Sequence, residues 1–211
     1  MTEEEAPETI FELNESHLNT GLRGIPVGTC RTSFVDPHKG VHYVGYPVGD
    51  LSDMDPTDII YLLFEKRLPN RQESQDFRNE MIGRAEDMPT GALRVLEAMT
   101  PSSGHPMDWL SVGIQALGIA DTTGDVRSDG LNLIARMPEL MAAIFRLRGG
   151  RGLIGRPSEP SRGMVENFVH LLGEDDESAE RIIRVLRSFL ILHMDHGGGN
   201  LSTFSGKAVA S

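Results

Sequence analysis

The fold is decided by residues 182–200, which read IIRVLRSFLILHMDHGGGN. Residues 182–192 carry apolar side chains at nearly every angle around a helix, and a helix that is apolar on all sides belongs in a core. We therefore predict a helix over residues 178–194 at the centre of the protein. The three consecutive glycines end this helix, because glycine readily leaves the helical conformation.

The composition is that of an ordinary globular protein. The chain has 211 residues, of which 39% are hydrophobic and 24% charged, and this length suffices for one large domain. The net charge of -11 argues against nucleic acid as a partner, since phosphate binding needs clustered Lys and Arg. The single cysteine, Cys30, excludes an intrachain disulfide, and we interpret it as a small, partly buried apolar residue.

The N-terminal residues 1–18 are acidic and polar, and we expect them to form a flexible lead-in. They contain no apolar segment of the kind found in a signal peptide. No apolar run in the chain approaches the ~20 residues that span a bilayer. We therefore expect a cytoplasmic protein that does not enter a membrane.

Residues 19–50 are rich in glycine and contain two short stretches of β-forming residues, 32–35 and 41–44. Between them lies Asp36-Pro37-His38-Lys39-Gly40, where proline fixes φ and glycine permits a positive φ. This pattern predicts a small β-hairpin.

From Asp55 onward the sequence predicts helices. Asp55 is a good N-cap, Pro56 fits the first helical turn, and Pro69 ends the segment. Asn70 and Glu73 have the spacing of a capping box for the next helix. Further helices are expected over 89–99, 106–118, 128–148 (with a kink at Pro138) and 162–172, with another starting near Ser202.

These elements indicate an all-α protein with a small β-hairpin near its N-terminus. Polar chemistry concentrates at the end of the most apolar helix, where His193, Asp195 and His196 place two imidazoles beside a carboxylate. The two histidines either cap the helix and complement its dipole or donate hydrogen bonds to an anionic substrate. A metal site using all three side chains is a further alternative, because His and Asp are ligands of Zn²⁺ and Fe²⁺. For this cluster we favour substrate binding.

Residues 193–204 read HMDHGGGNLSTF, and this segment resembles the signature H-x-D-H-x-x-x-N-x-S-T-F of the citrate synthase family. Further segments follow the family's order along the chain. They are Gly21–Ile25, Gly40–Tyr46, Tyr61–Leu63 with Leu68–Pro69, His105–Asp108, Leu133–Pro138 with Ala142–Arg146, and Glu166–Phe168.

The resemblance implies a multi-helical fold, a homodimer, and the joining of acetyl-CoA to oxaloacetate to give citrate and free CoA. In the family an aspartate removes a methyl proton from the thioester, one histidine stabilises the enol and a second histidine polarises the ketone. No cofactor is implied, since acetyl-CoA is a substrate. Residues 19–211 would then form the N-terminal part of the large domain, and the small domain is absent from this sequence.

The resemblance assigns few site residues. His196 matches the family histidine that binds oxaloacetate, and His193 matches its partner at the start of the signature. Arg146 is a candidate for contacting a CoA phosphate from the dimer neighbour, and is equally well interpreted as a solvated arginine. Val44 stands where the family has an arginine on the CoA side. The family's catalytic histidine and aspartate would lie beyond Ser211, so no catalytic residue is expected among residues 1–211.

The favoured function is therefore a citrate synthase, truncated or completed by a complementary C-terminal chain. The alternatives are a 2-methylcitrate synthase, a non-catalytic partner of a full-length synthase, and a metal-dependent enzyme. We expect no citrate synthesis by residues 1–211 alone. We also expect the helix over 178–194 to lose part of its cover, so that the chain self-associates.

Overall fold

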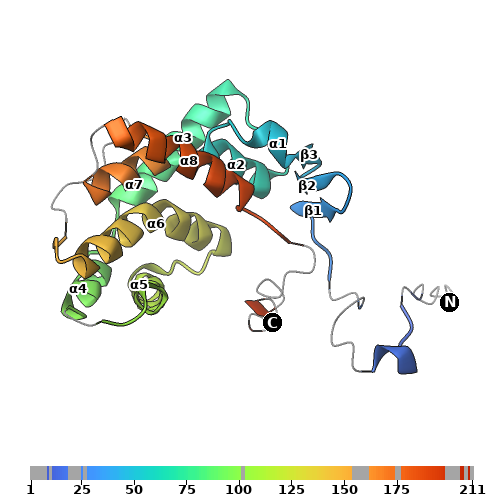
Figure 1. Cartoon of the computed structure of the whole chain (residues 1–211), viewed down its shortest axis with the longest axis horizontal. Helices are drawn as coiled ribbons and strands as arrows, with labels where there is room; N and C mark the ends of the chain where they lie inside the picture. The colour runs from blue at the N-terminus through green and yellow to red at the C-terminus, as the bar shows by residue number, and fades with distance from the viewer. Residues whose placement is uncertain are drawn as a thin grey trace, which may run out of the picture.

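Figure 1 shows a computed structural model of the chain, which describes residues 9, 11–18, 25, 28–100, 103–153, 162–173, 177–197, 205–206 and 209. Helices dominate these residues and follow a small antiparallel sheet, which confirms the all-α class. The elements are a 3-10 turn η1 (Glu15–His17), strands β1 (Ser33–Asp36), β2 (Gly40–Tyr43) and β3 (Tyr46–Pro47), and helices α1 (Val48–Leu51), α2 (Pro56–Glu65), α3 (Arg71–Glu86), α4 (Thr90–Ala98), α5 (Pro106–Asp121), α6 (Val126–Arg148), α7 (Met164–Leu172) and α8 (Glu177–Leu192).

The predicted hairpin is confirmed by the pairing of β1 with β2. Its turn is closed by the Asp36 carboxylate, which accepts hydrogen bonds from the backbone N–H groups of His38 and Lys39 at 2.7 and 2.8 Å. These two bonds lower the pKa of Asp36, because they stabilise its ionised form. Ser33 and Tyr43 are directly opposite each other in this register.

A second tight turn, at Val44 and Gly45, joins β2 to β3 and was missed by the sequence analysis. Both residues have positive φ, 49° and 88°, and they connect the paired residues Tyr43 and Tyr46. A two-residue loop with both φ values positive has the geometry of a type I′ turn. A β-branched residue such as Val44 seldom adopts this conformation, so the backbone is strained there.

The predicted helix caps are confirmed. Asp55 accepts a hydrogen bond from the Thr57 N–H at 2.9 Å, and Asn70 with Glu73 forms a reciprocal capping box. The helix begun at Pro56 nevertheless ends before the predicted stop at Pro69. Lys66 adopts a left-handed conformation and its N–H bonds to the Leu62 carbonyl at 2.8 Å.

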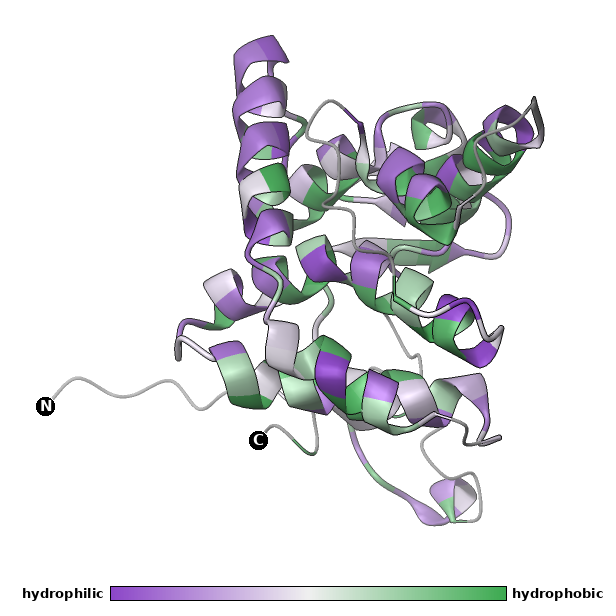
Figure 2. Cartoon of the chain, turned by 90° about the vertical axis from the view of Figure 1, so that its left-hand side faces the viewer, coloured by the Kyte–Doolittle hydropathy of each residue, from purple (hydrophilic) through white to green (hydrophobic). Residues whose placement is uncertain are grey.

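The centre of the fold is α6, which packs against α3, α4, α5 and α7. In Figure 1 these helices surround it, and in Figure 2 hydrophobic segments gather where helices face one another. The contact of α6 with α5 is close: a Cβ built on Gly113 would lie 2.9 Å from Cδ1 of Leu140. α6 continues through Pro138. Its fully or nearly buried side chains are Leu131, Ala135, Arg136, Leu140, Ala142, Ala143, Ile144 and Leu147.

The prediction that the apolar helix over 178–194 lies at the centre of the core is wrong for the described part of the chain. That helix is α8, and it packs against α1, α2 and α7 on one side. Ile191 is fully buried, whereas Val185, Phe189 and Leu192 are 61%, 56% and 44% exposed. Apolar side chains stay exposed here because no described element covers that side of the helix.

Two further predictions lie mostly outside the described residues. These are the motif at 21–25 and the helix expected from Ser202. The domain boundary at residue 18 stays a prediction. In the lead-in the structure places η1, capped by Asn14, whose side chain accepts a hydrogen bond from the Ser16 N–H at 3.0 Å.

Candidate functional site

The His-x-Asp-His segment forms the turn that leaves α8. The N–H groups of His193 and Met194 bond to carbonyls three residues earlier, each at 3.3 Å, which tightens the last turn of the helix. Both His193 and His196 are exposed. The residues between them are only partly exposed. The turn therefore presents two imidazoles to solvent at one end of the helix.

His193 is held in a defined orientation. Its ring stacks on that of Phe189 with centroids 4.2 Å apart, and its Nδ1 lies 2.8 Å from the Phe189 carbonyl oxygen. Since a carbonyl only accepts hydrogen bonds, Nδ1 carries a proton, and Nε2 is the nitrogen left for a ligand. The capping interpretation thus holds for one nitrogen of His193, while the other stays available.

His196 has no hydrogen bond or ion pair within the part of the chain that the structure describes. Its imidazole is exposed, and the residues on either side of it are anchored through their backbone. A side chain that is fixed at its backbone and unpaired at its tip is suited to bind a ligand.

The β-hairpin anchors this turn, and sequence reasoning did not find the two residues that do so. The fully buried Tyr43 donates its hydroxyl to the Ile191 carbonyl at 2.9 Å and accepts a hydrogen bond from the Asp195 N–H at 3.3 Å. Ser33 accepts a hydrogen bond from the Gly197 N–H at 2.6 Å. Burial raises the pKa of Tyr43, so its hydroxyl keeps the proton that it donates.

Cys30 lies against the same turn, and our interpretation of it as a partly buried apolar residue is wrong. The thiol is exposed, and a Cβ built on Gly197 would lie 2.0 Å from its sulfur. The hydroxyl of Thr32, 3.4 Å away, is the main cause that lowers the pKa of Cys30 to about 7. A hydroxyl at this distance stabilises the thiolate.

Arg146, the candidate CoA contact, lies at the other end of the molecule's helical body, where α6 ends. Its guanidinium donates to the carbonyls of Arg151 and Gly152, both at 3.1 Å, and to that of Leu172 at 3.4 Å. It is half-buried, so it is not a freely solvated arginine. These bonds tie the ends of α6 and α7 together. They use one N–H group on each of its three guanidinium nitrogens.

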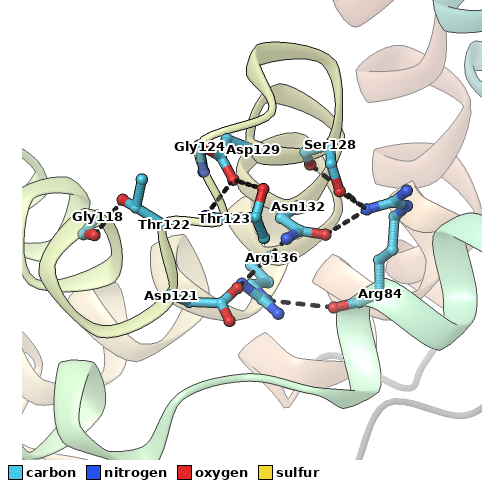
Figure 3. Close-up of polar contacts among 10 residues, drawn as sticks. All are labelled: Arg84, Gly118, Asp121, Thr122, Thr123, Gly124, Ser128, Asp129, Asn132 and Arg136. Atoms are coloured by element: carbon cyan, nitrogen blue, oxygen red, sulfur yellow. Dashed lines mark hydrogen bonds and ion pairs between the residues drawn. The ribbon is translucent and has the colours of Figure 1, made fainter.

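A second polar cluster joins α3, α5 and α6 (Figure 3). The nearly buried Arg136 pairs with the Asp121 carboxylate and donates to the Arg84 carbonyl at 3.2 Å. Arg84 in turn donates to Ser128 and Asn132. A cavity of about 250 Å³ adjoins this cluster. The polar groups drawn are paired with one another, which is typical of a structural junction between helices.

The metal-site alternative does not fit the geometry. His193, Asp195 and His196 all lie within the described residues, and no three His, Cys, Asp or Glu side chains there form a group that could hold a metal ion. Within the same residues, each helix is too short or too polar to span a membrane.

These features define a multi-helical chain with a pair of exposed histidines on a glycine-rich turn. A family profile described as "Citrate synthase, C-terminal domain" matches residues 21–211. The chain belongs to the citrate synthase family.

Curated and solved relatives agree with this assignment. Citrate synthase 2 of Bacillus subtilis is 32% identical over 89% of this chain and 50% of its own length. Citrate synthase 4, mitochondrial, of Arabidopsis thaliana is 27% identical over 90% of this chain and 44% of its own. The crystal structure of citrate synthase from Thermotoga maritima superposes with a TM-score of 0.76 at 27% identity, covering 90% of this chain and 50% of that one. The chain therefore spans about half the length of these relatives.

Proposed function

We propose that this chain supplies the oxaloacetate-binding part of a citrate synthase, with His196 and His193 as the residues that contact the substrate. The observation that carries the proposal is the exposed, backbone-anchored His196 within the His-x-Asp-His turn of a member of this family. Oxaloacetate carries two carboxylates and a ketone. The oxygens of the carboxylates and of the ketone accept hydrogen bonds from imidazole N–H groups.

The two histidines have different capacities. His193 uses its Nδ1 proton on the Phe189 carbonyl, so its Nε2 donates to a substrate only when the ring is protonated. Neither nitrogen of His196 has a partner among the described residues, so either one can donate to a substrate oxygen, depending on the tautomer. We therefore assign the ketone or carboxylate contact first to His196, with His193 contributing positive charge when protonated.

The complete reaction needs groups outside residues 1–211. A base takes a proton from the methyl group of acetyl-CoA, and the resulting enol carbon bonds to the ketone carbon of oxaloacetate. The ketone oxygen gains a proton, and water then cleaves the thioester to release CoA and citrate. The sequence contains no GPLHG segment, which by the resemblance carries a catalytic histidine. We propose that the base and this histidine come from the part of the family's sequence that follows, joined to this chain or separate.

Three further parts of the proposal follow from family membership. Acetyl-CoA is the second substrate and no cofactor takes part. Arg146 contacts a CoA phosphate with the N–H groups that its carbonyl contacts leave unused. The assembled enzyme is a homodimer, and its cytoplasmic location stays a prediction because the relatives named here include a mitochondrial enzyme.

A 2-methylcitrate synthase is the second candidate. The mitochondrial 2-methylcitrate synthase of Aspergillus fumigatus is 25% identical over 100% of this chain and 50% of its own length. That enzyme's name implies condensation with a three-carbon rather than a two-carbon acyl thioester. Comparing propionyl-CoA with acetyl-CoA in the assembled enzyme distinguishes the two activities.

The test has a binding arm and a turnover arm. Titration of the chain with oxaloacetate, followed by NMR of its histidines, should give a dissociation constant that rises roughly tenfold or more in H196A, because a hydrogen bond to a charged ligand is lost. His38→Ala is the matched control, since His38 is exposed at the hairpin turn. The turnover arm adds a polypeptide with the remaining half of a relative and measures CoA release.

Equal affinity of H196A and the unmodified chain would overturn the assignment of His196. Binding without CoA release in the mixture, together with copurification with a full-length synthase, would favour the non-catalytic partner instead. CoA release by the chain alone would contradict our expectation that residues 1–211 lack the catalytic groups.

A further inference from the structure

Two residues of the β-hairpin, Tyr43 and Ser33, hold the histidine turn from both sides (Figure 1 shows the tail of α8 running toward β1). We propose that they are positioning residues, which fix His193 and His196 in the geometry that binds oxaloacetate. This inference rests on the proposed function, because it concerns the same site.

Tyr43 joins the two ends of the segment that contains His193. Its hydroxyl donates to Ile191, at the end of α8, and accepts from Asp195, beyond the helix. One buried hydroxyl thus uses its donor and an acceptor to keep the chain folded back after the helix ends. Removing it would leave the buried Ile191 carbonyl and the partly buried Asp195 N–H without these partners, which is costly.

Ser33 provides the anchor on the far side of His196. Its oxygen accepts from the Gly197 N–H at 2.6 Å, while the Asp195 N–H is bound by Tyr43. His196 therefore lies between two residues whose N–H groups are both fixed to the hairpin. This leaves its backbone little freedom, whereas its side chain has no polar partner among the described residues.

Space as well as hydrogen bonding fixes this contact. A Cβ on Gly197 would lie 2.0 Å from the Cys30 sulfur and 3.1 Å from the Ser33 oxygen, so a side chain at this position would require Cys30 to move. The glycine of the signature thus allows the histidine turn to reach the hairpin.

The two anchors act as one unit. Ser33 and Tyr43 are opposite each other across β1 and β2, and directly opposite side chains project from the same face of a sheet. The Tyr43 ring is also packed in a core cluster with Leu51, Ile59, Leu62 and Ile191. A shift of one residue in the hairpin register would move both anchors to the wrong face.

The strained turn after Tyr43 is consistent with this role. Val44 takes a positive φ that its β-branched side chain disfavours, and its N–H bonds to the Thr32 carbonyl at 2.8 Å. Strain of this kind persists where surrounding contacts impose it, and it gathers near binding sites. Here the strained turn follows directly after the anchor residue Tyr43.

The experiment compares Y43F and S33A with the control Y46F in the full chain. Tyr46 lies across the strained turn from Tyr43, is 40% exposed and makes no such bond in the described structure. Histidine signals are recorded by ¹H–¹³C NMR across a pH series, at a temperature where circular dichroism shows each variant folded. We expect Y43F and S33A to change the shifts and titration curves of His193 and His196 and to leave that of His38 unchanged.

Oxaloacetate affinity supplies the second readout. Y43F should raise the dissociation constant about tenfold, S33A by a smaller factor, and Y46F not at all. Unchanged histidine titrations and unchanged affinity in folded Y43F would overturn the positioning role while leaving the proposed function intact. If the unmodified chain binds no oxaloacetate, the proposed function fails for this chain. The ligand-free histidine titrations then still decide whether Tyr43 and Ser33 set the geometry of the turn.

Discussion

Helices α6 and α8 are both long and rich in apolar residues, yet the structure treats them differently. α6 is enclosed by α3, α4, α5 and α7, and even its Arg136 is nearly buried. Within the described residues α8 packs against α1, α2 and α7, and its Val185, Phe189 and Leu192 stay exposed. An apolar sequence pattern indicates that a helix surface can be buried against another element. Such a surface is buried only where the described chain places an element against it.

The first way to sharpen this comparison is a pair of leucine truncations. Leu140 of α6 is fully buried against Gly113, whereas Leu192 of α8 is 44% exposed. L140A should lower the free energy of unfolding by about 2–5 kcal/mol, because it leaves a cavity. L192A should change it by less than about 1 kcal/mol. Urea denaturation checks both values, and equal losses would mean that α8 is buried in solution after all.

The second prediction concerns the exposed stripe on α8, made of Val185, Phe189 and Leu192. We expect V185E to weaken self-association of the chain by about tenfold, since a charge opposes burial of an apolar contact. Arg184→Glu is the control, because Arg184 is exposed on the same helix. Sedimentation velocity over a concentration series measures the change. If the unmodified chain stays monomeric at high concentration, the expected self-association is contradicted.

The smallest effect is expected at Glu139 of α6. Burial raises the pKa of Glu139 above its ordinary value of 4.5, so the folded state binds the proton more tightly than the unfolded state. The contribution of protonated Glu139 to the free energy of unfolding is complete below pH 4.5. It is lost as the pH rises through the raised pKa of Glu139. E139Q should therefore melt about 2 °C higher than the unmodified chain at pH 7, with no difference at pH 4.

The control for this substitution is Glu86→Gln, because Glu86 is exposed at the end of α3. Thermal melts at the two pH values provide the measurement. A gain in E139Q that persists unchanged at pH 4 would show that ionisation of Glu139 is not its cause.

Local signals in the sequence predicted local structure well. Asp55 and Asn70 cap helices as expected, because capping depends on side chains within three residues of the bond they satisfy. The end of α2 at Lys66 and the strained turn at Val44 were missed, since neither residue type favours a positive φ. At Val44 a contact outside the turn, the hydrogen bond of its N–H to the Thr32 carbonyl, holds the conformation that the residue type disfavours.

The site was only partly predictable. His193 and His196 were found from their spacing and from the family signature. Tyr43 and Ser33 were not, because their hydrogen bonds to the turn join residues 148 to 164 positions apart. A pattern within a short stretch of sequence cannot predict contacts between residues so far apart in the chain. The burial of α8 was overestimated for the same reason, since its cover depends on distant segments.

The long separation between Tyr43 and Asp195 also has a consequence for biosynthesis. The hairpin leaves the ribosome early, and its binding partner is made 152 residues later. At a translation rate of about 5–20 residues per second, the turn that Tyr43 anchors is synthesised on the order of ten to thirty seconds after Tyr43 itself. During that interval its ring and hydroxyl lack their native contacts with α8. The histidine turn therefore assembles late, after most of the helical body has had time to form.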